Sequence, residues 1–186
     1  MIARIKALVV LGLLRARRGG PGGRLGDGAE VREAVEARLA AVRAPVLHQP
    51  VEDDLGRSIT FEKQPRNLVS LAPSISSMLA FMDLADHLVG VTEFCPVPED
   101  LSPYRIGNLS QPSIESIVAL RPDLVIGSEM TPMDVYERIE AAGIQTFVFK
   151  HQELDDVVRD IKWLSLILGL PSYGIQAATQ LEARAQ

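Results

Sequence analysis

Residues 112–127 read Pro112-Ser-Ile-Glu-Ser-Ile-Val-Ala-Leu-Arg-Pro-Asp-Leu-Val-Ile-Gly127, a short helical pattern followed at once by an apolar run. Ser113 suits the N-cap of a helix over 114–120, because its hydroxyl can accept a hydrogen bond from a free backbone N–H of the first turn. The run after Pro122 has the length and composition of a strand buried on both faces. This stretch therefore predicts one helix–strand unit of an α/β fold.

The same alternation extends in both directions along the chain. We predict Ser74 as the N-cap of one helix, Thr131 and Pro132 as the N-cap and first residue of another, and Gly143 as the left-handed residue that ends it. Strands of four to six residues between helices favour a Rossmann-like lobe, with a mostly parallel sheet flanked by helices on both faces. The expected elements are a hairpin at 51–61, strands at 67–71, 87–91, 122–127 and 144–149, helices at 74–83, 114–120, 131–143 and 154–168, and a last helix at 172–186.

Composition narrows the class of protein. The 186 residues suffice for one domain with a short appendage, and 47% hydrophobic with 23% charged residues is typical of a globular chain. The net charge of −5 does not favour binding to nucleic acid, which calls for a basic surface. The single cysteine, Cys95, excludes an intrachain disulfide. No apolar run reaches the roughly 18 residues that a membrane-spanning helix needs.

The first 46 residues leave two interpretations open. Arg4 and Lys6 precede a short apolar run at 7–14, which is how an export signal begins. Three arginines follow at once, without a small-residue cleavage site, and positive charge there opposes translocation. The segment is therefore either a signal, which predicts a periplasmic or other extracytoplasmic protein, or a disordered extension, which predicts a cytoplasmic one. We place the domain boundaries at 1–46, 47–169 and 170–186.

Candidate ligand residues gather where the predicted strands end. Ligands of open parallel sheets bind beyond the carboxyl ends of the strands, which here lead into 72–74, 92–98 and 128–131, with the loop 105–112 beside them. Phe94 can stack on a flat ligand or pack its own loop, and the Ser74 hydroxyl can meet a ligand or cap a helix. The full set of predicted ligand residues is Ser74, Phe94, Cys95, Asn108, Leu109 and Ser128.

These loops contain no catalytic constellation. His48, His87 and His151 lie far apart in sequence and lack the spacing of metal ligands. Cys95 has no neighbouring base to activate it as a nucleophile, which favours a packing role. The residues therefore predict a binding protein rather than an enzyme, with no metal site and no resident cofactor.

Five segments, taken in order, resemble the cobalamin and ferric-siderophore binding proteins that serve ABC importers. The segments are 54–57 (Asp-Leu-Gly-Arg), 65–74, 88–98, 106–108 (Ile-Gly-Asn) and 112–126, and the resemblance covers residues 51–186. It implies a class III periplasmic binding protein, in which two α/β lobes joined by one long helix hold the ligand between them and dock on a membrane permease. The implied function is the substrate-binding component of an importer for cobalamin, haem or a ferric siderophore.

The resemblance also assigns roles to single residues. Phe94 matches an aromatic ligand-binding position, whereas Leu109 and Ser128 occupy other such positions without a ring. Glu115 matches the carboxylate that pairs with permease arginines. In the first turn of a helix it can equally complement the helix dipole.

The chain departs from the family pattern at its end. It stops within the segment that resembles the connecting helix, so we expect the second lobe to be absent and half of the cleft to be missing. Either the chain is a fragment or truncated product, or a partner or self-association supplies the other half. Two further functions stay open: a non-exported, degenerate lobe with a sensing or structural role, and an enzyme on a similar scaffold.

Overall fold

The computed structural model describes residues 50–185, and it confirms an α/β lobe built on a parallel sheet. Within these residues, a five-stranded sheet has the order β5-β4-β3-β6-β7, and every neighbouring pair of strands is parallel. The strands are β3 (Leu68–Ser70), β4 (Leu88–Val91), β5 (Tyr104–Arg105), β6 (Leu124–Ser128) and β7 (Thr146–Phe149).

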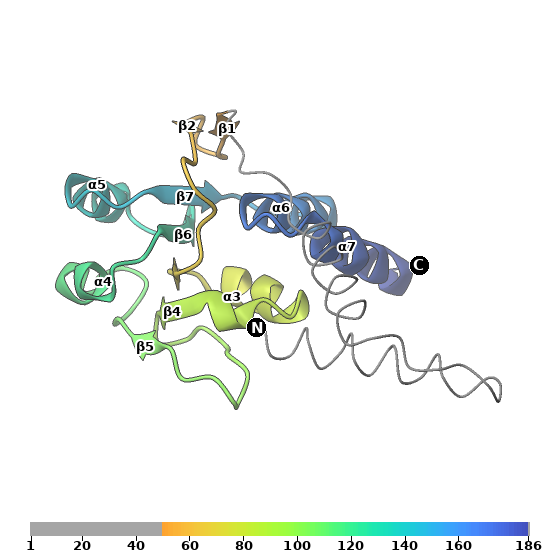
Figure 1. Ribbon diagram of the computed structural model, residues 1–186, viewed down its shortest axis with the longest axis horizontal. Coiled ribbons are helices and arrows are strands. Elements are labelled where there is room, and N and C mark those ends of the chain that lie inside the picture. Colours follow the sequence, from red (N-terminus) through yellow and green to blue (C-terminus); the bar gives the residue numbers. More distant parts are fainter. Residues whose placement is uncertain (1–49, 186) are drawn as a thin grey trace, which may run out of the picture. The chain divides into compact units, whose positions relative to one another are not determined.

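Helices cover both faces of this sheet, as predicted. Figure 1 shows α4 and α5 on one side of the strands, and α3, α6 and α7 on the other. Their bounds are α3 (Pro73–Phe81), α4 (Ile114–Leu120), α5 (Met133–Ala141), α6 (Leu154–Ile167) and α7 (Pro171–Ala185), with a 3-10 turn η1 (Ala85–His87) before β4. No helix among the described residues is long and apolar enough to cross a membrane.

The core follows from the alternation of side chains along the buried strands. Val69, Val125 and Val148 point toward α4 and α5, where they join Ile117 and Ile139 in one fully buried cluster. On the opposite face of β7, the rings of Phe147 and Phe149 lie 4.8 Å apart between their centroids. Because both faces of β3, β6 and β7 are buried, these strands appear in the sequence as continuous apolar runs rather than alternating ones.

Gly127 allows one of the helices to approach the sheet closely. A Cβ atom built at this position would lie 2.2 Å from the hydroxyl oxygen of Tyr136 on α5. That hydroxyl donates a hydrogen bond of 2.8 Å to the carbonyl of Ser128. A glycine in β6 therefore makes room for the tyrosine that ties α5 to the end of the strand.

The predicted hairpin forms a small antiparallel sheet of its own, from β1 (Val51–Glu52) and β2 (Ser58–Ile59). Gly56 supplies the positive φ of 76° that its turn requires. The turn bonds to the free edge of β7, because Asp54 N donates to Val148 O over 3.1 Å. Figure 1 shows the hairpin beside β7, away from β4 and β5.

Two predicted helix starts are wrong, and each lies beside a proline. The N-cap of α3 is Ala72 rather than Ser74, since Pro73 occupies the first helical position, where its missing N–H has no cost. The N-cap of α5 is Pro132 rather than Thr131, so the helix begins at Met133. The prediction for α4 is confirmed: Ser113 is the N-cap and accepts a bond of 3.1 Å from Ser116 N.

The remaining predictions, and one strand that was not predicted, compare with the structure as follows. Gly143 and Gly169 have the positive φ expected after α5 and α6, at 80° and 67°. Strand β5 was not predicted, and it pairs in parallel with the end of β4. The predicted extension at 1–46 lies outside the described residues, and the boundary between a lobe ending at 169 and a connecting helix stays a prediction.

Candidate functional site

The predicted ligand residues all follow strands that lie next to one another in the sheet. Asn108 and Leu109 come after β5, Phe94 and Cys95 after β4, and Ser74 after β3, while Ser128 is the last residue of β6. Since β5, β4, β3 and β6 are parallel neighbours, their carboxyl ends form one continuous edge. The structure therefore brings the six residues to one edge of the sheet.

The loop after β4 sends two adjacent side chains in opposite directions. The Phe94 side chain projects outward, and the residue is 78% exposed. Cys95 is only 2% exposed, and its Sγ lies 3.1 Å from the hydroxyl of Thr92 inside the fold. The phenyl ring is therefore open to solvent at the sheet edge, whereas the thiol packs inward.

The other predicted residues differ in what they offer at this edge. Ser74 is partly exposed in the first turn of α3. Asn108 is exposed, and its side-chain oxygen accepts a bond of 2.8 Å from Gln111 N, which shapes the loop. Leu109 is partly buried against the core cluster. The roles of all these residues as ligand contacts stay predictions.

Ser128 is buried, and its polar atoms bond to other residues of the protein. Its hydroxyl accepts a long bond of 3.4 Å from Met130 N, and its carbonyl accepts from Tyr136. Burial raises the pKa of Tyr136 to about 12. The tyrosine thus stays neutral and remains a hydrogen-bond donor at physiological pH.

Met130 was missed by the sequence analysis as a candidate. It follows β6 and is 71% exposed, an exposure that among the large apolar side chains of residues 50–185 only Phe94 exceeds. The ends of β4 and β6 are separated by β3 alone, so they lie about 10 Å apart at the usual strand spacing. Its position within the predicted strand-end loop 128–131 was the available signal, alongside that of Phe94 in the loop 92–98.

Glu115 lies beside this edge rather than on it. It is exposed in the first turn of α4, where the Ser113 hydroxyl donates a bond of 3.4 Å to its carboxylate. A surface carboxylate in this position is available to a partner and also complements the helix dipole. Its predicted docking role is untested by these contacts.

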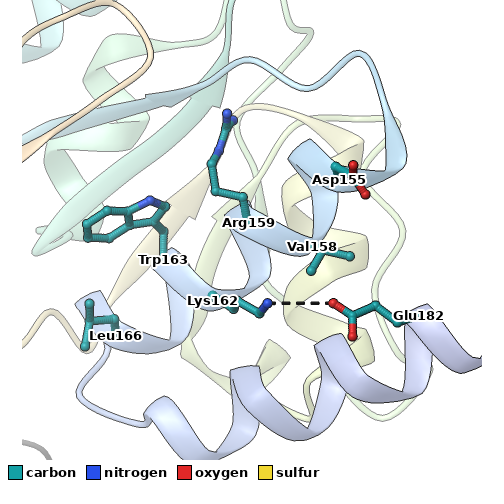
Figure 2. Close-up of a pocket in the computed structure, with 7 residues that line it drawn as sticks. All are labelled: Asp155, Val158, Arg159, Lys162, Trp163, Leu166 and Glu182. Carbon is teal, nitrogen blue, oxygen red and sulfur yellow. Dashed lines mark ion pairs between the residues drawn. The ribbon is translucent and has the colours of Figure 1, made fainter.

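A separate groove of about 490 Å³ lies between α6 and α7. Figure 2 shows Trp163 and Leu166 projecting from α6, and the ion pair of 3.7 Å from Lys162 to Glu182 that joins the two helices. None of the six predicted ligand residues is among those that line it. Within residues 50–185, no three His, Cys, Asp or Glu side chains are grouped to hold a metal ion.

The chain is similar to known proteins over most of its length. Residues 68–186 match a protein family described as periplasmic binding protein. An uncharacterized ABC transporter substrate-binding lipoprotein of Bacillus subtilis, YvrC, is 25% identical over 130 residues, covering 67% of this chain and 41% of the relative.

Two solved structures share both fold and sequence with the chain. The periplasmic vitamin B12 binding protein BtuF of Vibrio cholerae is 28% identical with a TM-score of 0.60, covering 66% of this chain and 49% of that one. The periplasmic heme-binding protein RhuT of Roseiflexus sp. RS-1, in apo form, is 30% identical with a TM-score of 0.58, covering 63% and 46%. The chain therefore spans less than half the length of each of these proteins.

The family match covers more than half of the chain, and it agrees with the resemblance carried by the five sequence segments. The parallel sheet flanked by helices is the fold of both solved relatives at a sequence identity above one quarter. The chain belongs to the periplasmic binding protein family.

Proposed function

We propose that the chain forms one wall of the ligand site of an ABC-importer substrate-binding protein, and that the ligand is a metal chelate: cobalamin, haem or a ferric siderophore. The observation that carries the proposal is the apolar edge made by Phe94 and Met130, which are 78% and 71% exposed on the loops after β4 and β6. Large apolar side chains gain free energy when a ligand removes them from water.

The chemistry of the edge suits binding rather than turnover. Phe94 presents a ring face for stacking on a macrocycle, and Met130 presents a polarizable thioether that adapts to an irregular surface. The relatives support the ligand class, because one is named for vitamin B12 and another for heme. Such a protein works on the extracytoplasmic side of the membrane, where it passes its ligand to a permease.

Titration of the full chain with cyanocobalamin, hemin and ferrichrome tests this proposal. Phe94→Ala should weaken binding of the accepted probe by about tenfold to a hundredfold, since burying a phenylalanine side chain contributes roughly 1.5–3 kcal/mol. Phe81→Ala is the matched control, because Phe81 is an exposed ring at the end of α3 where Arg184 stacks on it. Equilibrium dialysis gives the dissociation constants.

Two results would contradict the proposal. One is a parent chain that binds none of the three probes. The other is an unchanged affinity in Phe94→Ala, which would move the ligand away from the sheet edge.

Glu115 is proposed as the residue that meets the permease. Glu115→Arg should lower uptake through the cognate permease by about tenfold, because like charges brought together at an interface cost several kcal/mol. Ligand affinity should not change, since the residue lies on α4 and not on the strand-end loops. Glu137→Arg reverses another exposed carboxylate, on α5, and serves as the control. Unaltered uptake in Glu115→Arg would refute the docking role.

A further inference from the structure

The loop that carries Phe94 is held by one arginine from the neighbouring strand. Arg105 lies on β5, opposite Val91, the last residue of β4. Its Nη1 donates to the carbonyl oxygens of Thr92 at 2.9 Å and of Cys95 at 2.8 Å. A longer bond of 3.3 Å reaches the carbonyl of Glu93. Three backbone carbonyls of a four-residue turn thus converge on one guanidinium nitrogen.

The positive charge of Arg105 therefore stabilises the three converging carbonyl groups. Carbonyl dipoles that point at a common centre repel one another unless a positive group lies between them, and bonds from a charged donor are about twice as strong as neutral ones. Arg105 is linked to the loop only through main-chain atoms in these bonds. Their geometry therefore depends on the conformation of the turn and not on its side chains.

Further hydrogen bonds hold the turn. The Thr92 hydroxyl donates to the carbonyl of Leu71 over 3.2 Å. Cys95 N donates to Thr92 O over 3.2 Å, and Glu93 N donates to Gly107 O over 2.9 Å. The Phe94 side chain takes part in none of these bonds and is exposed.

We propose that Arg105 is the positioning residue of the ligand site: it fixes the turn 92–95 so that the Phe94 ring is presented before a ligand arrives. The fixing of the turn stands on the contacts alone, and its value for affinity rests on the proposed function. A loop ordered in advance spares the complex the entropy of ordering it on binding. The arginine needs no contact with the ligand to act in this way.

Hydrogen exchange of the unliganded full chain tests the positioning role directly. Arg105→Met keeps the length of the side chain and removes its charge and donors. We expect the amides of Glu93 and Cys95 to exchange about tenfold faster or more, because a charge-assisted bond network no longer opposes local opening. Arg105→Lys keeps a cation on a flexible stem and should recover part of the protection.

The controls separate loosening of the turn from loss of the fold. Arg138→Met removes another exposed arginine, from α5, and should leave the turn amides unchanged. The amide of Val125, which donates to Gln145 O between β6 and β7, should keep its protection in every variant. Unchanged exchange at Glu93 and Cys95 in Arg105→Met would overturn the inference.

Binding of hemin, cyanocobalamin and ferrichrome supplies the second readout. For the probe that the parent chain accepts, Arg105→Met should lower affinity by about tenfold, with Arg105→Lys in between. A turn that loosens while affinity holds would also overturn the positioning role. If the parent chain accepts none of the three probes, the proposed function fails, and the exchange result still decides whether Arg105 fixes the turn.

Discussion

Asp53→Ala should lower the free energy of unfolding of the full chain by about 3 kcal/mol or more, because it removes a buried carboxylate that accepts five hydrogen bonds. The Asp53 side chain is fully buried. It accepts two bonds from the Arg57 guanidinium, at 3.0 and 2.6 Å. It also accepts backbone bonds from Leu55, Arg57 and Val148, at 3.1, 3.0 and 3.2 Å.

The size of this effect follows from what alanine would leave behind. Val148 N belongs to the edge strand β7 and would lose its acceptor inside the fold. Arg57 would keep its bond to Glu140 at 2.6 Å, but its charge would lose the buried carboxylate beside it. An unpaired polar group in the interior costs roughly 1–3 kcal/mol on its own.

Urea unfolding followed by circular dichroism measures the difference. Glu52→Ala is the control, since Glu52 is an exposed carboxylate on the preceding position of the hairpin. It should stay within about 0.5 kcal/mol of the parent chain, as surface substitutions usually do. In the double variant Asp53→Ala with Arg57→Met, the two losses should not add, because both remove the same pair. A loss for Asp53→Ala as small as that of Glu52→Ala would contradict the conclusion that Asp53 stabilises the contact between the hairpin and β7.

The strands that are buried on both faces could be predicted from the sequence. Strands β3, β6 and β7 are buried on both faces, so each is an apolar run that local pattern can detect. Strand β5 has two residues, Tyr104 and Arg105, and both are exposed. Its strand conformation comes from pairing with β4, a tertiary contact that leaves no hydrophobic pattern. That is why the sequence analysis placed a loop there.

The sheet edge that carries the candidate site could also be predicted, but not which of its side chains are exposed. Parallel topology alone sends the loops after β3, β4 and β6 to one edge. The exposure of Phe94 and the burial of Cys95 occur in a turn whose Cys95 carbonyl accepts a bond from Arg105, ten residues along the chain. The exposed Met130 follows a strand end at which Ser128 bonds to Met130 N and to Tyr136. Such contacts form only in the folded chain and cannot be read from residue spacing.

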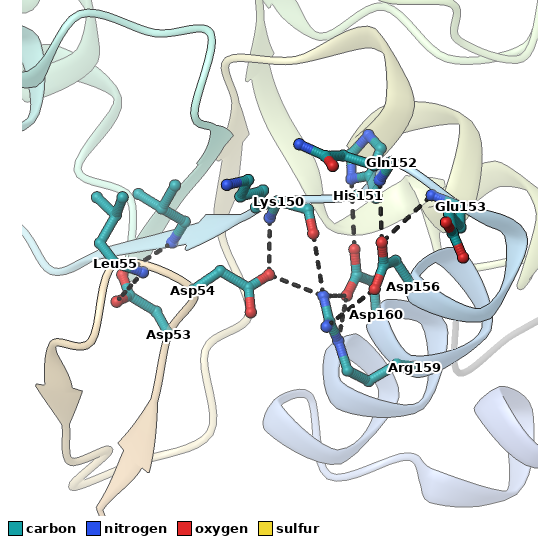
Figure 3. A network of polar contacts seen from close by, with 11 residues as sticks. Asp53, Asp54, Leu55, Lys150, His151, Gln152, Glu153, Asp156, Arg159 and Asp160 are labelled. Carbon is teal, nitrogen blue, oxygen red and sulfur yellow. Dashed lines mark hydrogen bonds and ion pairs between the residues drawn. The ribbon is translucent and has the colours of Figure 1, made fainter.

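The second large expected effect is a change of stability with pH that arises from a buried carboxylate, Asp160. Figure 3 shows Asp160, on α6, between Arg159 and His151. Its Oδ1 accepts bonds of 3.1 and 2.9 Å from Arg159, and its Oδ2 faces His151 Nδ1 at 3.3 Å. Arg159 also bonds to Asp54 at 2.8 Å and to Asp156 at 3.2 Å. The Asp160 side chain is fully inaccessible to solvent.

Burial raises the pKa of Asp160 to about 6, although Arg159 and His151 favour its charged form and Asp54 opposes it. An ordinary aspartate titrates near 3.8, so between about pH 4 and pH 6 the Asp160 carboxyl binds more protons in the folded chain than in the unfolded chain. The contribution of Asp160 to stability is therefore full at the acidic end of this window and is lost as the pH rises through it. Asp123 and Asp156 have lowered pKa values and act in the opposite direction.

Comparison with Asp160→Asn isolates this group, because the amide does not titrate and the other carboxylates are common to both proteins. The stability of the parent chain relative to Asp160→Asn should fall by about 2–3 kcal/mol between about pH 4 and pH 7, since two pKa units correspond to that difference. Urea unfolding at several pH values gives the two curves. The same pair of measurements in a His151→Gln background removes the imidazole that faces Asp160. Parallel curves in that background would mean that Asp160 is ionised in the fold at all these pH values, with Arg159 outweighing its burial.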